Sequence, residues 1–173
     1  DTVEPAPAQP GDPDLRLAGK GFLLSGSSGS DSAADMALQP DGKLILGCTA
    51  DNGVTRAIRI MRFLDNGSPD NTFGAAGSVT LPARNGDDSA CAVALQPNGK
   101  ILIAGHSLNN SVAPTRDVVV ARLNDDGSLD ADFADNGFYF LDVFGGEDRA
   151  ADMALHDDGT IIVGGSTWNG SDD

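Results

Sequence analysis

The sequence predicts an all-β fold of the β-propeller type, in which four-stranded antiparallel blades repeat every ~57–60 residues and the terminal blade is incomplete. The phrase ALQPDGKLIL at 37–46 returns at 94–103, and in a more divergent form at 154–163. Its glycines, Gly42 and Gly99, stand 57 positions apart, and Gly159 follows after a further 60. The chain holds 22 glycines among short runs of β-branched residues, and no window has the period of an amphipathic helix. Four-stranded units of this length are typical of propeller blades, because β-helix coils and leucine-rich repeats are shorter.

The second repeat shows the expected strands most clearly. Its first hairpin turns at 96–99 (QPNG), where proline presets one turn residue and Asn-Gly accepts positive φ. The second strand is expected to stop at Gly105, before a polar loop. A second turn, NDDGS at 124–128, precedes the fourth strand. The four expected strands are 90–95, 100–104, 118–123 and 137–143.

The phase of the repeat predicts how the chain is divided. Prolines at 5, 7, 10 and 13 mark an extended N-terminal segment, and the chain starts at an aspartate, which suggests a processed start or a tether. The third repeat lacks a counterpart of the third strand. The expected units are an extension at 1–13 and a repeat region at 14–173, comprising a leading fourth strand at 21–25, repeats at about 31–82 and 88–143, and a partial repeat at about 148–173.

Three parts of the second repeat form a distinctive pattern: ALQPNGKILIAG at 94–105, DVVVARLNDDGSLD at 117–130, and Phe133. This pattern resembles the delta-60 repeat family, the tandem β-propeller-like repeats of large bacterial secreted or surface proteins. The resemblance covers nearly everything from Gly11 onward. It implies a propeller-like fold and an extracellular or cell-surface location, and it implies no agreed activity.

Charge narrows the class of partner. The formal net charge is −15 and the pI is near 4.1, with no cluster of Lys or Arg, so nucleic acid and an anionic membrane surface are disfavoured. No apolar run approaches the roughly 18 residues that a membrane helix needs, so membrane insertion is not expected. Most carboxylates are expected to be solvated on an exported protein.

Two cysteines and two histidines are the remaining reactive side chains. Cys48 and Cys91 occupy small-residue positions of the repeat, so the alternatives are a disulfide between neighbouring repeats or two buried thiols. His106 and His156 lie at different phases of the repeat, and we expect them at turns or on the surface. No Ser/His/Asp or Cys/His constellation is present, so no enzyme activity and no cofactor are expected.

Acidic turns are the one candidate for a metal site. Calcium prefers six to eight oxygen ligands, which clustered Asp, Asn and Ser residues can supply. The same residues also form Asx turns and cap turns without any ion. Arg62 and Arg122, one repeat apart, are expected to brace each blade through Asp70 and Asp130. The candidate calcium ligands are Asp65, Asp70, Asp125, Asp126 and Asp130.

The unfinished ends lead to the functional hypotheses. We expect a non-catalytic extracellular scaffold that forms a homo-oligomer or filament, or continues a longer repeat array, through the edges of its incomplete blades. The alternative is a module that binds carbohydrate or a surface protein, with calcium assisting, through loops at 107–116 and 165–170. Trp168, expected in the second loop, suits either role. The residues expected at the self-association edges are Phe22, Leu24, Ile161, Val163 and Trp168.

Overall fold

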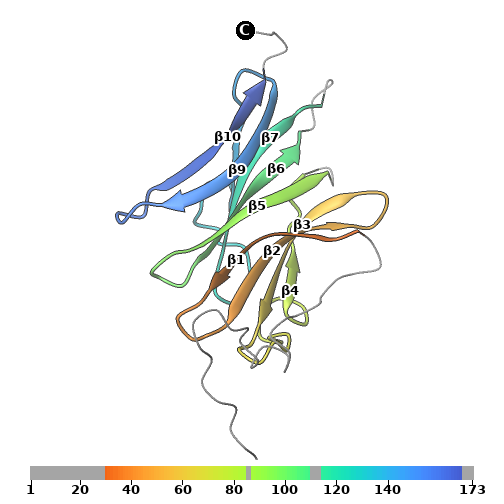
Figure 1. Cartoon of the computed structure of the whole chain (residues 1–173). Coiled ribbons are helices and arrows are strands. Elements are labelled where there is room, and N and C mark those ends of the chain that lie inside the picture. The colour runs from red at the N-terminus through yellow and green to blue at the C-terminus, as the bar shows by residue number, and fades with distance from the viewer. Residues whose placement is uncertain (1–29, 85–86, 110–113, 169–173) are drawn as a thin grey trace, which may run out of the picture.

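The computed structural model describes residues 30–84, 87–109 and 114–168, which form three antiparallel sheets (Figure 1). The first sheet comprises β1 (Ser32–Leu38), β2 (Leu44–Asp51), β3 (Arg56–Phe63) and β4 (Ser78–Thr80), paired in that order. The second comprises β5 (Asp88–Leu95), β6 (Ile101–Leu108), β7 (Arg116–Leu123) and β8 (Phe138–Leu141), again in chain order. The third pairs β9 (Glu147–Leu155) with β10 (Ile161–Trp168). The four-stranded antiparallel unit predicted from the repeat is therefore confirmed.

Each sheet begins with the tight hairpin that the repeated phrase predicts. In the first, the Gln39 N–H donates to the Lys43 carbonyl at 2.8 Å, and the Gly42 N–H donates back to Gln39 at 2.9 Å. Gly42 has φ of 86°, and its counterparts Gly99 and Gly159 have 82° and 86°. Because a side chain disfavours this left-handed backbone, the glycine of the phrase is required by the turn.

The expected end of the second strand at Gly105 is wrong, because β6 continues to Leu108. The neighbouring strand has a β-bulge between Ala90 and Ala92. The bulge brings the Ser89 carbonyl so close that a Cβ on Gly105 would lie 2.0 Å from its oxygen. The glycine therefore allows close backbone approach inside the strand and does not terminate it.

Two other expectations are wrong because the strands are longer than predicted. His106 lies within β6 and is half-buried, so it is not a turn residue, and burial lowers its pKa. Trp168 is the last residue of β10 and not part of a loop. His156 does lie at the β9–β10 turn, with its side chain 3.3 Å from Asp158. The extension at 1–13, the strand at 21–25, Phe22 and Leu24 lie outside the described residues.

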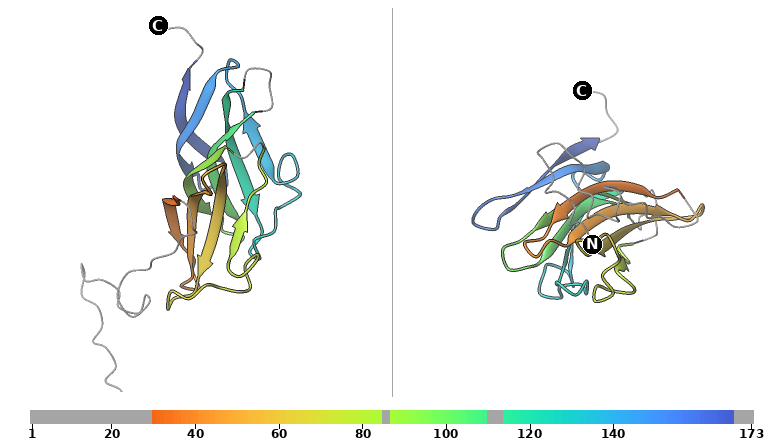
Figure 2. Two further views of the ribbon diagram at one scale, coloured as in Figure 1. Left: turned by 90° about the vertical axis from the view of Figure 1, so that its right-hand side faces the viewer. Right: turned by 60° about the horizontal axis from the view of Figure 1, so that its bottom comes forward.

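The three sheets follow one another in space as they do in sequence. In Figure 1 and the left view of Figure 2, β5–β8 (green to cyan) lie between β1–β4 and the β9–β10 hairpin (blue). Alternate residues of β6 face the two neighbours: Ile101 and Ile103 pack in a core with the first sheet, whereas Leu102 and Ala104 pack with the third. The middle sheet is thus apolar on both faces, as sandwiched strands are.

Polar contacts join the sheets along one rim. Arg56, at the start of β3, pairs with Asp87 at 2.5 Å, and Arg116, at the start of β7, pairs with the other oxygen of Asp87 at 2.5 Å. Arg116 also reaches Glu147, at the start of β9, at 3.3 Å. These ion pairs link all three sheets, and their arginines and acidic residues stand 60 positions apart in successive repeats. Within the described residues there is no helix that could span a bilayer.

Candidate functional site

The repeated Arg–Asp pairs lie at the outer end of each complete sheet. Arg62 Nε donates to Asp70 Oδ2 at 2.8 Å, and Arg122 Nε donates to Asp130 Oδ2 at 2.7 Å. Both aspartates are buried, with 3% and 4% of their surface exposed. The bracing role expected for the two arginines is confirmed. Each carboxylate also lies beside a lysine ammonium, Lys43 at 3.5 Å from Asp70 and Lys100 at 3.2 Å from Asp130. Two cations therefore already neutralise each single carboxylate, which disfavours a further one.

The first of these carboxylates is strongly stabilised in its charged form. The Thr72 hydroxyl donates to Asp70 Oδ1 at 2.7 Å, and the Thr72 N–H donates to the same oxygen at 3.0 Å. Together with Arg62 and Lys43, these donors lower the pKa of Asp70 to about 2, the Thr72 hydroxyl contributing most. Asp70 is thus occupied by protein donors and is ionised at neutral pH.

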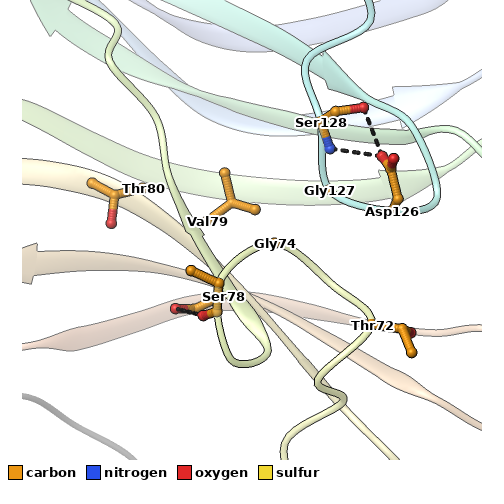
Figure 3. Close-up of a pocket in the computed structure, with 9 residues that line it drawn as sticks. Thr72, Gly74, Ser78, Val79, Thr80, Asp126, Gly127 and Ser128 are labelled. Atoms are coloured by element: carbon orange, nitrogen blue, oxygen red, sulfur yellow. Dashed lines mark hydrogen bonds between the residues drawn. The ribbon is translucent and has the colours of Figure 1, made fainter.

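The remaining calcium candidates lie on exposed turns. Asp65 and Asp125 are exposed, and Asp125 Oδ1 accepts a hydrogen bond from Arg62 Nη1 at 2.9 Å. Asp126 Oδ1 accepts both the N–H and the hydroxyl of Ser128, at 2.9 and 2.6 Å. Figure 3 draws these two bonds as dashed lines between Ser128 and Asp126. The hydroxyl bond is the main reason that the pKa of Asp126 is lowered. The geometry is that of an Asx turn.

Figure 3 shows the hollow beside this turn. It measures about 550 Å³ and lies between the 72–80 segment of the first sheet and the 126–128 turn of the second. The Gly74 N–H donates across it to the Asp126 carbonyl at 2.8 Å, which joins the two sheets. Apart from Val79 and Asp126, its described lining residues are small or hydroxylated. The Asp126 carboxylate is the only titratable group among them, so we assign this hollow no chemistry.

The first sheet leaves one apolar face uncovered by any described strand. On β2, Ile45 points into the core shared with the second sheet, so its neighbours Leu44 and Leu46 point the opposite way. Met36 and Leu38 on β1 pair with Leu46 and Leu44 and share that face. Met36 is 64% exposed and Leu38 70%. We call these four residues the leading face.

The third sheet has a second face that no described strand covers. Ile161 and Val163 pack into the core shared with the second sheet, so these two predicted edge residues turn their side chains inward. Ile162, between them, points away and is 52% exposed, whereas its counterparts Ile45 and Leu102 are 0% exposed. A Cβ on the adjacent Gly164 would meet nothing within 4 Å. We call Ile162 and Gly164 the trailing face.

The outer edge of β10 is also unpaired in the described residues. Its counterparts β2 and β6 each pair on both sides, with β3 and β7 as outer partners, whereas β10 pairs only with β9. Trp168, at the end of this strand, is 57% exposed. The unpaired edge and the two uncovered faces are the features of the molecule that are suited to contact another surface.

Both cysteines are free thiols in the structure. Cys48 is buried, and Cys91 is the bulged residue of β5, half-buried against the second core. Burial raises the pKa of both thiols, that of Cys91 to about 11. A thiol with so high a pKa is a weak nucleophile and metal ligand at neutral pH.

Sequence reasoning missed one cluster. Asp117 at the start of β7, Asp142 just after β8, and Asp148 at the start of β9 each bring a carboxylate oxygen within 4.8 Å of the others. A comparison of the repeats could have found it, because 60 positions earlier Ala57 and Pro82 stand where Asp117 and Asp142 do.

Comparison with known proteins supports the fold and leaves the activity open. Residues 39–73 and 96–133 match the family model described as a domain of unknown function (DUF5122) beta-propeller. The two matched segments fall in equivalent parts of the first and second repeats, from the hairpin turn to the Phe73 and Phe133 positions. Neither a curated protein nor a solved structure gives a significant match.

Proposed function

We propose that the protein is a non-catalytic structural module, located outside the cell or on its surface, that associates with a second copy of itself. In this association the trailing face of one copy packs on the leading face of the next. The observation that carries the proposal is that the two faces are counterparts of surfaces that already pack together twice within the chain.

The internal packing shows what each face is shaped to meet. Within the first core, the β2 residues Ile45 and Gly47 face Val93 and Ile103 of the second sheet. A Cβ on Gly47 would lie only 2.6 Å from Val93 Cγ2 and 3.0 Å from Ile103 Cδ1. Trailing-face residues Ile162 and Gly164 stand at the Ile45 and Gly47 positions.

The leading face supplies the other half of this contact. By the repeat, Met36 and Leu46 stand where Val93 and Ile103 stand. Docking two copies would therefore place Met36 and Leu46 over Gly164 and beside Ile162, apolar against apolar. The described residues of each copy form three sheets, the third with two strands, so two copies would bring six such sheets together, a number within the four to eight blades typical of propellers.

Charge opposes the association and makes it salt-dependent. Each copy carries a net charge of −15, so two copies repel at low ionic strength. Salt screens this repulsion over a Debye length of about 10 Å at 0.1 M, whereas the apolar contact is not weakened by salt. Association should therefore strengthen between 0.05 and 0.5 M salt.

Light scattering coupled to size exclusion tests the proposal on the full chain. The wild type should show a mass that rises with concentration above 17.7 kDa. Met36→Asp and Ile162→Asp should each reduce the association, because each places a carboxylate in the apolar contact. Val54→Asp is the matched control: Val54 is 89% exposed at the β2–β3 turn and belongs to neither face.

Mixing the two variants distinguishes this contact from a symmetric one. Met36→Asp retains an intact trailing face and Ile162→Asp an intact leading face, so the mixture should form heterodimers although each variant alone is monomeric. Wild-type protein that stays monomeric at hundreds of micromolar and in high salt would refute the proposal. Equal loss with Val54→Asp would refute the assignment of the faces.

A further inference from the structure

The junction between the second and third sheets concentrates negative charge. Asp117 and Asp148 are buried, with 3% and 1% of their surface exposed, and Asp142 is exposed at the mouth of the cluster. One guanidinium, that of Arg84, contacts the cluster through Asp117, to which Asn109 also donates at 3.0 Å. Three carboxylates thus share one positive partner among the described residues, a net charge of −2.

Asp148 has an oxygen with no partner. Its Oδ2 accepts the Val143 N–H at 2.6 Å, which ties down the segment between β8 and β9. Its Oδ1 is fully buried and accepts no hydrogen bond from any residue that the structure describes. A buried carboxylate oxygen left without a donor has lost its hydration with no compensating bond, so a positive or hydrogen-bonding ligand at this position would be stabilising.

There is space for such a ligand beside Asp148. The residue lines a cavity of about 190 Å³. Val118 and Leu141, the chain neighbours of Asp117 and Asp142, line the same cavity, as does Thr167 of β10. The Thr167 hydroxyl donates to the Val143 carbonyl at 3.3 Å. Residues of both sheets therefore enclose this space, and the residues with polar side chains in its described lining are Asp148, Ser166, Thr167 and Arg149.

The other sheet junction provides an internal comparison. Asp88 occupies the position of Asp148, and its Oδ1 is likewise buried without a partner. There, however, Ala57 and Pro82 replace Asp117 and Asp142, so the single carboxyl is not joined by others. Burial raises the pKa of Asp88. The junction between the second and third sheets differs because it has three carboxylates, enough to hold a cation.

We propose that Asp117, Asp142 and Asp148 bind a single calcium ion that fastens the third sheet to the second. The ligands are all oxygens, and the cluster has no His or Cys, which excludes the donor set preferred by zinc and copper. Calcium accepts irregular oxygen coordination completed by water, and Asp142 at the mouth leaves room for water, whereas magnesium requires a near-ideal octahedron. Two positive charges neutralise the cluster.

Calorimetric titration of the chelator-treated full chain with calcium chloride tests the site. One ion per chain should bind, and calcium should raise the melting temperature. Asp142→Asn should weaken binding at least about tenfold, since affinity follows the charge count of the ligands. Its side chain is exposed, so the variant should keep the wild-type circular dichroism spectrum. Asp126→Asn, in the exposed 124–128 turn of the second repeat, is the matched control and should bind like the wild type.

The outcomes separate this proposal from the self-association. Wild-type protein that shows no calcium heat and no melting shift at 10 mM calcium, a concentration above that at which extracellular modules saturate (about 1 mM), refutes the site. Binding that survives Asp142→Asn but is lost in Asp126→Asn places the ion in the turns and also refutes it. Neither result bears on Met36 or Ile162, whose variants are measured by mass and not by calcium.

Discussion

Replacing Ile45 and Ile162 by alanine compares one residue type at one repeat position with and without a covering sheet. Ile45 is 0% exposed in the core between the first and second sheets, whereas Ile162 is 52% exposed. Each substitution removes three carbons, worth about 2.4 kcal/mol of transfer free energy when fully buried, at about 0.8 kcal/mol per CH₂. At Ile45 the cavity left behind adds to this, so we expect a loss of about 2–5 kcal/mol.

The expected loss at Ile162 is smaller because half of the side chain is already in water. It should be about 1 kcal/mol, with no cavity term, since no described strand encloses the site. Urea unfolding followed by far-ultraviolet circular dichroism measures both free energies of unfolding. The measurement belongs at low micromolar concentration, where association does not contribute. Equal losses at the two positions in monomeric protein would mean that Ile162 is covered, and the trailing face would be wrongly assigned.

Three further predictions rest on single groups. The pKa of Asp70 is about 2 against an ordinary value of 3.8, so the ionised carboxylate contributes about 2 kcal/mol to the free energy of unfolding above pH 4, and this contribution is lost as the pH falls toward 2. Asp70→Asn should flatten this part of the pH profile of the free energy of unfolding. A profile that the substitution leaves unchanged would contradict this prediction. Gly47→Ala should lower the free energy of unfolding by about 1–3 kcal/mol, because the added methyl group overpacks Val93. Gly164→Ala should change it by less than about 0.5 kcal/mol. Similar urea midpoints for the two variants would argue against open space at Gly164. Because burial raises the pKa of Cys91 to about 11, the native thiol should react with an aromatic disulfide at pH 8 about a hundredfold more slowly than in the urea-unfolded chain, and equal rates would show that it is not protected.

The parts of the fold that depend on local chemistry could be predicted from the sequence. The hairpin turns follow from Gln-Pro-Asp/Asn-Gly, which permits few other conformations. The Arg62–Asp70 and Arg122–Asp130 pairs follow from a constant spacing of eight residues across a turn. In each case the interacting groups are close in sequence, so the repeat places them without knowledge of the packing.

The features that the sequence did not reveal depend on contacts between sheets. In the sequence, a glycine at position 105 is compatible with the end of a strand and with close approach of the Ser89 carbonyl inside a strand. Only the bulge in β5 decides between the two. Asp117 and Asp148 are 31 residues apart and meet because β7 and β9 lie in adjacent sheets. Both faces of β10 are apolar in sequence, so alternation could not show that Ile161 and Val163 face inward while Ile162 faces outward.

Equivalent residues in this chain are chemically alike, and what distinguishes them is the neighbouring sheet. The Arg62 side chain is 2% exposed because its Nη1 reaches the Asp125 carbonyl of the next sheet at 2.5 Å. Arg122 makes the same internal contacts with Asp130 and Phe133 but is 21% exposed, and the described part of the third sheet offers it no such carbonyl. The same contrast separates Ile45 from Ile162 and Gly47 from Gly164. In an array whose units contact only their neighbours, stability is the sum of unit and interface contributions. Among the described residues the middle sheet has two interfaces and each outer sheet has one. The outer sheets therefore gain most from a further partner, which is the physical basis of the proposed association.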